Sequence, residues 1–259
     1  DEDVLVWFGH SWYFMQTDGK KFLVDPVFSG HASPMSFSIK AFDGSDVYSV
    51  EDMPEIDFLI ITHDHWDHLD YETLIKLKPK ISKVICGLGV GEHLEFWGFS
   101  SEKIIEKDWD EFVDLEDGFE INTVTARHFS GRGLKRNQSL WMAYVLKTPT
   151  KRIFIGGDSG YGKHFAEIGE NFGPFDLAIL ENGQYNKAWP YIHILPEQFI
   201  KSAIELKAGR VLPVHSSKFA LANHSWTEPL ELLTQNNQKE LINIATPKIG
   251  EPIMLNDKT

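Results

Sequence analysis

A cluster of histidine and aspartate side chains just after Thr62 is the part of the sequence best suited to chemistry. The run His63-Asp64-His65-Trp66-Asp67-His68 has the pattern His-x-His-x-Asp-His and follows an apolar run that ends at Ile61. Successive side chains of a strand point to opposite faces, so one strand cannot gather these groups, whereas a loop leaving its end can. Imidazole and carboxylate suit Zn(II), Mn(II) or Fe(II), and the pattern lacks the thiolates of common structural zinc sites. The sequence therefore predicts a loop-borne metal site.

Further ligand-type residues follow apolar runs later in the chain. His128 follows the run 121–126, Asp158 the run 153–157 and His215 the run 211–214. Taken singly, Asp158 could be a helix N-cap, His128 a loop histidine and His215 a buried histidine with a hydrogen-bond partner. Their shared position past a strand favours ligands, because four ligands from one loop cannot complete the coordination of two ions.

These candidate ligands need strands to position them, and the chain alternates predicted strands and helices. Strands are predicted at 4–8, 13–16, 21–25, 58–61, 84–86, 119–125, 140–147, 152–155, 177–180 and 211–214. Helices are predicted at 71–77, 89–97, 161–168 and 196–206, with a polar loop over about 29–47. Two halves with strands followed by helices favour an α/β (α+β) fold, in which two sheets pack face to face with helices outside.

Length and composition favour one soluble domain. The chain has 259 residues, of which 42% are hydrophobic, enough for one large two-layered domain or two small ones. We find no linker, no repeat and no apolar run near the roughly 18 residues of a transmembrane helix. We therefore expect a single domain over residues 1–259.

Charge and cysteine content bear on partners and compartment. The formal net charge of −13 disfavours nucleic acid as a substrate, since backbone binding relies on clustered Lys and Arg. The single cysteine, Cys86, favours a reducing, cytoplasmic compartment. Because the sequence begins at Asp1 rather than Met, it leaves open whether a signal or membrane anchor preceded it.

The His-x-His-x-Asp-His run together with the later ligand-type residues resembles the metallo-β-lactamase superfamily. Within it, the segments 25–29, 128–133, 157–162 and 172–178 resemble the N-acyl-phosphatidylethanolamine phospholipase D branch. The resemblance implies a four-layered αββα sandwich of two mixed β-sheets, and it runs from about Val4 to beyond His215.

The resemblance also implies a dinuclear centre with two divalent ions per chain. His63, His65 and His128 would hold one ion and Asp67, His68 and His215 the other, with Asp158 and a hydroxide bridging them, about 3.5 to 4 Å apart. Zinc is expected, with manganese or iron as alternatives. Two dications, two carboxylates and one hydroxide leave about +1, which suits a phosphodiester monoanion.

Three residues outside the ligand set are candidates for supporting roles. Asp64 could orient a ligand or the bridging water and so assist catalysis, or it could make a plain loop hydrogen bond. Asp25 invites the same ligand-supporting interpretation. His193 matches a histidine that the phospholipase D branch places beside its metals, and could donate to a phosphoryl oxygen or protonate the leaving group, or it could be a helix-entry histidine bonded to the backbone.

Substrate-binding candidates lie in two loops. Arg132, Lys135 and Arg136 form a local basic cluster after His128, which could hold an anionic head group or simply be a solvated loop face. Gln184 and Tyr185 belong to a polar segment that stands where the phospholipase relatives carry an apolar one, and that segment could line the substrate end. This departure leaves the phospholipid part of the substrate open.

The leading hypothesis is a dinuclear metal-dependent hydrolase of a small-molecule phosphodiester or a phospholipid-like substrate, with membrane contact and oligomeric state left open. A second is a metal-dependent lactonase that resembles the L-ascorbate-6-phosphate lactonases of the same superfamily. A third, from another class, is a metal-binding protein without catalysis, which the full ligand set disfavours. Assays of a phosphodiester and a phosphorylated lactone side by side distinguish the first two.

Overall fold

Two β-sheets form the centre of the protein, which a computed structural model describes over residues 2–256. The first sheet contains β1 (Val4–Trp7), β2 (Tyr13–Thr17), β3 (Lys20–Val24), β4 (Ile56–Ile60), β5 (Ile81–Gly87), β6 (Ile104–Lys107) and β13 (Pro252–Met254). The second contains β7 (Phe112–Asp114), β8 (Glu120–Val124), β9 (Ala143–Lys147), β10 (Arg152–Ile155), β11 (Leu177–Glu181) and β12 (Val211–Val214). Their strand orders are β13-β1-β2-β3-β4-β5-β6 and β12-β11-β10-β9-β8-β7.

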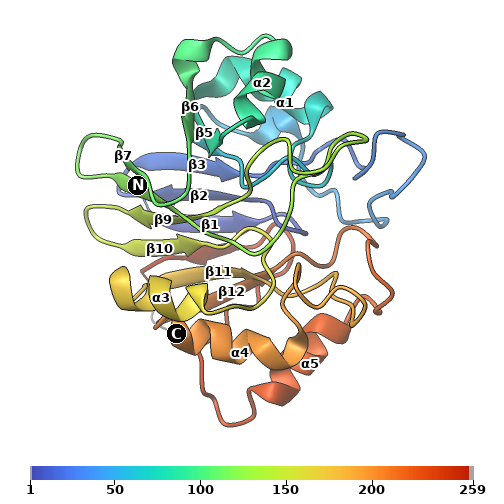
Figure 1. The fold of residues 1–259 in the computed structure, drawn as a ribbon, viewed down its shortest axis with the longest axis vertical. Coiled ribbons are helices and arrows are strands. Elements are labelled where there is room, and N and C mark those ends of the chain that lie inside the picture. The colour runs from blue at the N-terminus through green and yellow to red at the C-terminus, as the bar shows by residue number, and fades with distance from the viewer. Residues whose placement is uncertain (1, 257–259) are drawn as a thin grey trace.

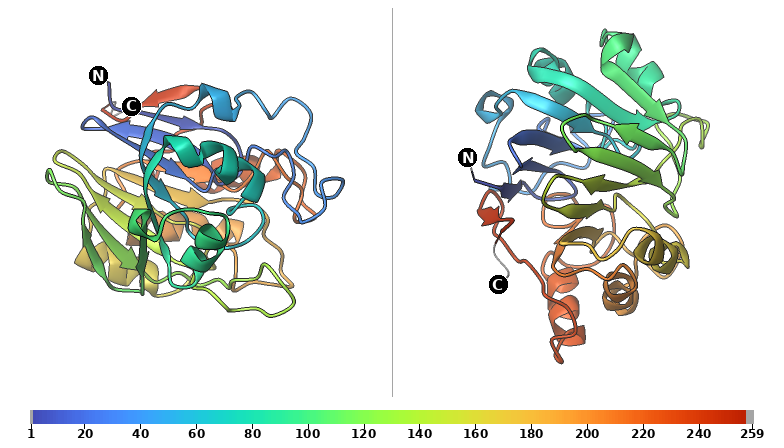
Figure 2. Two further views of the ribbon diagram at one scale, coloured as in Figure 1. Left: turned by 90° about the horizontal axis from the view of Figure 1, so that it is seen from above. Right: turned by 90° about the vertical axis from the view of Figure 1, so that its left-hand side faces the viewer.

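Helices cover the outer faces of both sheets (Figures 1 and 2). The first sheet carries α1 (Tyr71–Leu77) and α2 (Val90–Phe96), and the second carries α3 (His164–Asn171), α4 (Pro196–Glu205) and α5 (Glu228–Asn236). Short 3-10 helices occur at η1 (Val50–Asp52), η2 (Lys78–Lys80) and η3 (Ser101–Lys103). The arrangement confirms the expected αββα sandwich of two mixed sheets.

The apolar runs in the sequence are explained by burial on both faces of the central strands. In β11, Leu177 and Ile179 belong to the core between the two sheets, whereas Ala178 and Leu180 pack in the core beneath the helices of the second sheet. Because alternate side chains enter two different cores, every position except the last is apolar.

The strand directions bring the candidate ligands to one edge. β4 is parallel to β3 and β5, and β10, β11 and β12 are mutually parallel. The intervening β9 is antiparallel to both β8 and β10, so β8 runs the same way as β10. Long loops gather at one side of the molecule, on the right in Figure 1, among them those after β8 and β12.

Most predicted elements appear in the structure, with differences at the margins. The helix predicted at 161–168 begins later, at His164, because residues 158–163 form a loop whose Gly160 N–H bonds the Arg127 carbonyl. The sequence analysis missed β6, β7, β13 and α5. β7 and β13 are edge strands of three residues each, and β13 starts with Pro252. Both are too short to show the alternation of apolar and polar residues that identifies a strand in the sequence. Within residues 2–256, the helices all lack the length and apolar character of a transmembrane span.

Candidate metal centre

The candidate ligands sit immediately beyond strand ends. The loop after β4 carries His63, His65, Asp67 and His68, while Asp158 follows β10 and His215 follows β12 directly. Gly157 permits the close approach of the Asp158 loop to the histidine loop. It has φ +57°, and a Cβ there would lie 2.9 Å from Thr62 Cβ. A glycine before Asp158 therefore allows the two loops to approach closely enough for their side chains to meet.

Three imidazoles converge in a first group. His63 Nε2 lies 3.0 Å from His65 Nδ1, and His128 Nε2 lies 3.2 Å from the same nitrogen. A tetrahedral zinc with bonds of 2.0–2.1 Å has nitrogen ligands about 3.3 Å apart. The spacing of these three nitrogens is therefore close to that of ligands around one ion.

A second group gathers around the carboxylate of Asp67. Its Oδ2 lies 3.4 Å from His68 Nε2, 3.5 Å from His215 Nε2 and 2.8 Å from His10 Nε2. His68 and His215 are spaced as co-ligands of Asp67, while the shorter contact of His10 is a hydrogen bond.

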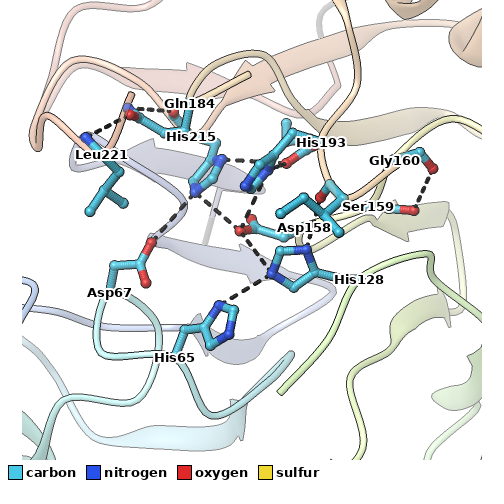
Figure 3. A network of polar contacts seen from close by, with 12 residues as sticks. His65, Asp67, His128, Asp158, Ser159, Gly160, Gln184, His193, His215 and Leu221 are labelled. Carbon is cyan, nitrogen blue, oxygen red and sulfur yellow. Dashed lines mark hydrogen bonds and ion pairs between the residues drawn. The ribbon is translucent and has the colours of Figure 1, made fainter. Parts of the chain in front are cut away.

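Asp158 lies between the two groups. Its Oδ2 is 3.1 Å from His215 Nε2 and 3.3 Å from His68 Nε2 in the second group, and 3.8 and 3.9 Å from the Nε2 atoms of His128 and His63 in the first. Figure 3 shows its carboxylate between the rings of His215 and His128. The structure thus brings together all seven residues that the sequence analysis named as ligands.

The donor atoms suit a metal. His68 Nε2, His215 Nε2 and Asp158 Oδ1 are buried and have no hydrogen-bond partner among residues 2–256. Buried polar atoms without partners are unfavourable, and a cation satisfies them. Imidazole and carboxylate donors without a nearby thiolate fit Zn, Mn or Fe.

The pKa values of the metal-free groups reflect burial and mutual charge. Burial holds the pKa of His63 and of His128 well below the usual value, which leaves both rings neutral as ligands must be. Burial opposes protonation of His68 too, but Asp158, Asp67 and Asp25 outweigh it and raise its pKa well above the usual value. Burial would raise the pKa of Asp158, yet His215 and His68 hold it well below the usual value. Metal binding at His68 therefore releases a proton.

Asp25 supports the histidine loop. It accepts a hydrogen bond from Thr62 N at 2.8 Å and from Thr62 Oγ1 at 2.5 Å, and its Oδ2 lies 2.8 Å from His68 Nδ1. With Nδ1 bonded to a carboxylate, the ring of His68 turns Nε2 toward Asp67 and Asp158. This contact is of the ligand-supporting kind that the sequence analysis expected of Asp25.

Replacing Asp25 with Ala should weaken metal binding about 10- to 100-fold, the usual effect of losing a carboxylate behind a metal-bound histidine. Competition with a chelating indicator measures the affinity. Asp57→Ala is the matched control, because Asp57 accepts from Lys21 N on the neighbouring strand without contacting the ligands. Equal affinities for the wild type and Asp25→Ala would show that His68 needs no such support.

His193 lies beside both ligand groups. Its ring centroid is 5.2 Å from that of His128 and 5.0 Å from that of His215, and its side chain is 11% exposed. Its Nδ1 is 2.7 Å from Glu181 Oε2 and 4.0 Å from Asp158 Oδ2. Figure 3 shows the ring at the margin of the cluster of ligands.

Asp64 takes the loop hydrogen-bond role rather than a catalytic one. Its Oδ1 accepts from Gly131 N at 2.8 Å, and its Oδ2 lies 3.9 Å from His93 on α2. The carboxylate thus ties the histidine loop to the loop after His128 instead of orienting a ligand.

Arg132 also differs from its expected substrate-binding role. Its guanidinium stacks 3.9 Å over the ring of Trp66 and donates to the carbonyls of Asp64 and Leu69. Burial lowers the pKa of Arg132 to about 10, although Asp64 and Asp70 oppose this change. The side chain therefore braces the histidine loop.

The other two residues of the basic cluster are exposed. Lys135 and Arg136 lie in the loop after His128, and the guanidinium of Arg136 stacks 4.8 Å over the ring of Phe129. Both remain candidates for contact with an anionic group.

Gln184 is an internal residue, contrary to the expectation that it binds substrate. Only 3% of it is exposed, and its side chain bonds the carbonyls of His215 and Phe219 and the N–H groups of Leu221 and Ala222 (Figure 3). The polar side chain of Gln184 therefore holds the loop after His215 by hydrogen bonds.

Tyr185 lies next to Gln184 but borders a cavity of about 500 Å³. Its hydroxyl donates to Glu228 Oε1 at 2.9 Å, and its ring stacks on His224. His224 and Glu228 line the same cavity, so Tyr185 is the member of the predicted pair that can meet a ligand there.

Sequence reasoning missed two buried residues of this centre. His10 is fully buried and orients Asp67, and burial lowers its pKa to about 4, so that it is a neutral donor to the carboxylate. Glu181 is buried between His193 and His215. Each lies at or just beyond the end of an apolar strand, the same signal that identified the ligands.

Comparisons with known proteins agree with the geometry. The model of the beta-lactamase superfamily domain matches residues 20–216, a span that contains all seven candidate ligands. The chain is 38% identical over 251 residues to an uncharacterized protein of Mycobacterium tuberculosis, covering 95% of this chain and 67% of that protein. It is 30% identical over 244 residues to N-acyl-phosphatidylethanolamine-hydrolyzing phospholipase D 1 of Caenorhabditis elegans, covering 89% and 68%.

A solved structure shares the fold. Igni18, a metallo hydrolase of the archaeon Ignicoccus hospitalis, superposes with a TM-score of 0.74 at 20% identity and covers 98% of each chain. The chain thus belongs to the metallo-β-lactamase superfamily, in a branch near N-acyl-phosphatidylethanolamine phospholipase D, and is a metal-dependent hydrolase of that superfamily.

Proposed function

We propose that the protein is a dinuclear metal-dependent phosphodiesterase whose reaction resembles that of phospholipase D. The position of Asp158 carries the proposal, because one of its oxygens borders both ligand groups, at 3.1 Å from His215 Nε2 and 3.8 Å from His128 Nε2. A tetrahedral ion takes four ligands, whereas seven ligand-type residues converge here. Two ions match this donor set better than one.

The residues divide between two ions. His63, His65 and His128 would hold one and Asp67, His68 and His215 the other, with Asp158 shared; we expect zinc. When bound, two such ions polarise a phosphoryl group and bring the pKa of water near neutrality. Two dications outweigh two carboxylates, so the centre stays positive and attracts a phosphodiester monoanion.

His193 would act on the substrate directly. With Nδ1 engaged by Glu181, its Nε2 is the ring nitrogen left to meet a ligand. In its acid form, which carries a proton on each ring nitrogen, His193 lies beside His128 and His215 and can donate from Nε2 to a phosphoryl oxygen or protonate the departing alkoxide, while Nδ1–H stays bonded to Glu181.

A phospholipid-like substrate is the first choice within this reaction class. It is supported by the similarity to the nematode enzyme, which is named for hydrolysis of N-acyl-phosphatidylethanolamine. The polar segment around Gln184 is compatible with a lipid substrate, because the side chain of Gln184 makes internal hydrogen bonds and does not face a substrate. Lys135 and Arg136, which are exposed in the loop after His128, are our candidates for binding a second anionic group.

The metal-loaded protein should hydrolyse bis(p-nitrophenyl) phosphate, lose activity on chelation and regain it with a divalent ion, because the chemistry depends on the ions. Elemental analysis should give two metals per chain. Phosphatidylethanolamines with and without an N-acyl group test the substrate class by release of phosphatidate.

A phosphorylated lactone, assayed beside the phosphodiesters, gives the contrasting result. If the loaded protein opens the lactone and leaves every phosphodiester intact, the protein is a lactonase. If it binds two metals and cleaves neither, catalysis of this class is ruled out.

A further inference from the structure

Glu181 is a buried carboxylate at the end of an otherwise apolar strand. It is the last residue of β11, which lies between β10 and β12, and it is 1% exposed. A buried carboxylate is unfavourable unless hydrogen bonds or charges compensate it. Its partners therefore indicate why the chain keeps it there.

All the contacts of Glu181 lead to the candidate site. Oε2 lies 2.7 Å from His193 Nδ1 and 3.4 Å from His215 Nδ1. Oε1 accepts the backbone N–H of Ile194, the residue after His193. One carboxylate thus meets a candidate metal ligand, the candidate catalytic histidine and the backbone beside that histidine.

The contact with His193 is a hydrogen bond rather than a shared coordination sphere. At 2.7 Å the two atoms are closer than the roughly 3.3 Å that separates ligands of a tetrahedral ion. Since the carboxylate oxygen accepts, His193 Nδ1 is the donor and carries a proton in both the neutral and the acid form of the ring. The other nitrogen, Nε2, then faces the substrate.

The contact with His215, a candidate metal ligand, is an ion-pair contact of 3.4 Å between Oε2 and Nδ1 rather than a hydrogen bond. Its Nε2 lies 3.1 Å from Asp158 and 3.5 Å from Asp67, while Nδ1 faces Glu181 on the opposite side of the ring. A carboxylate behind the non-coordinating nitrogen of a histidine fixes its tautomer and ring orientation.

We propose that Glu181 is a shared positioning residue: one oxygen of its carboxylate fixes the tautomer and orientation of His193 by a hydrogen bond and orients the ring of His215 by an ion-pair contact. Its effect on turnover rests on the proposed function of His193, whereas its effects on tautomer and metal affinity do not. The role is distinct from that of Asp25, which contacts His68 but not the catalytic candidate.

Glu181→Leu tests the proposal against His193→Ala and a control. Asn182→Ala is the control, because Asn182 is the next residue and equally buried but donates to the Pro229 carbonyl, away from the ligands. Glu181→Leu should weaken metal affinity about 10- to 100-fold and lower turnover about 10²-fold. His193→Ala should lower turnover and leave metal affinity unchanged. Asn182→Ala should change neither turnover nor metal affinity.

Ring ¹⁵N NMR gives a readout independent of activity. In the wild type, the neutral form of His193 should carry its proton at Nδ1, so that the second proton of the acid form is the one on Nε2, and in Glu181→Leu this preference should be lost. Glu181→Gln keeps the shape of the side chain and one acceptor oxygen, so it should keep part of the metal affinity and part of the His193 tautomer preference. If the Leu variant does not fold, the Gln variant tests the role of Glu181.

Leaving groups separate positioning from general damage. Because His193 would protonate the departing oxygen, Glu181→Leu should slow release of an alkoxide far more than release of p-nitrophenolate. Unchanged metal affinity together with an unchanged His193 tautomer in both Glu181 variants would overturn the proposal. If the wild type cleaves no phosphodiester, the proposed function fails, and the affinity and NMR results still decide the role of Glu181.

Discussion

Replacing Asp158 with Ala should lower turnover by at least about 10³-fold and reduce the metal content from two ions toward one. Loss of several kcal/mol of electrostatic stabilisation corresponds to such a factor. Asp158 supplies the oxygen that lies within 3.1 to 3.9 Å of imidazole nitrogens in both groups. Without it, two dications in one site would repel each other with one carboxylate fewer between them.

Elemental analysis and kcat/KM on a phosphodiester measure these two losses. Asp18→Asn is a suitable control, since Asp18 also accepts several hydrogen bonds, including one of 2.6 Å from Thr148 Oγ1, but lies in the turn between β2 and β3. Asp158→Asn refines the result by keeping the shape of the side chain while removing its charge. Two full equivalents of metal and wild-type turnover in Asp158→Ala would refute the shared-ligand role.

Replacing His193 with Ala should lower turnover about 10²-fold while metal content stays at the wild-type level, the size expected for losing a general acid or a donor to a developing negative charge. His193 lies near His128 and His215, yet its Nδ1 is 4.0 Å from Asp158 Oδ2 and engaged by Glu181. It therefore belongs to the site without belonging to the donor set. The effect should appear in kcat more than in KM, because the interaction forms in the transition state.

His31→Ala is the control for removal of a histidine, since His31 bonds the Ser33 carbonyl in the loop before β4. If His193 protonates the departing oxygen, the decrease in kcat of His193→Ala relative to the wild type should be larger for a substrate with a poor leaving group. An unchanged kcat on both good and poor leaving groups would assign His193 to structure.

The sequence alone determined the class of fold and the places where candidate ligands occur. Strands such as β11 are buried on both faces, so their apolar runs are easily recognised, and a polar residue just beyond such a run stands out. This reasoning found the candidate ligands after β4, β8, β10 and β12. It failed for short edge strands such as β7 and β13, which have too few residues to show a period.

Tertiary structure alone decided what each polar residue does. Asp64 and Asp67 stand in the same loop with the same side chain, yet one bonds Gly131 N and the other faces His10, His68 and His215. Gln184 and Glu181 lie in one polar segment, but the first holds a loop and the second reaches two histidines. Side-chain type and strand-end position are local properties, readable along the chain. Which groups meet depends on sheet order and loop direction, which bring residues 10, 67, 158 and 215 to one point only when the two sheets pack.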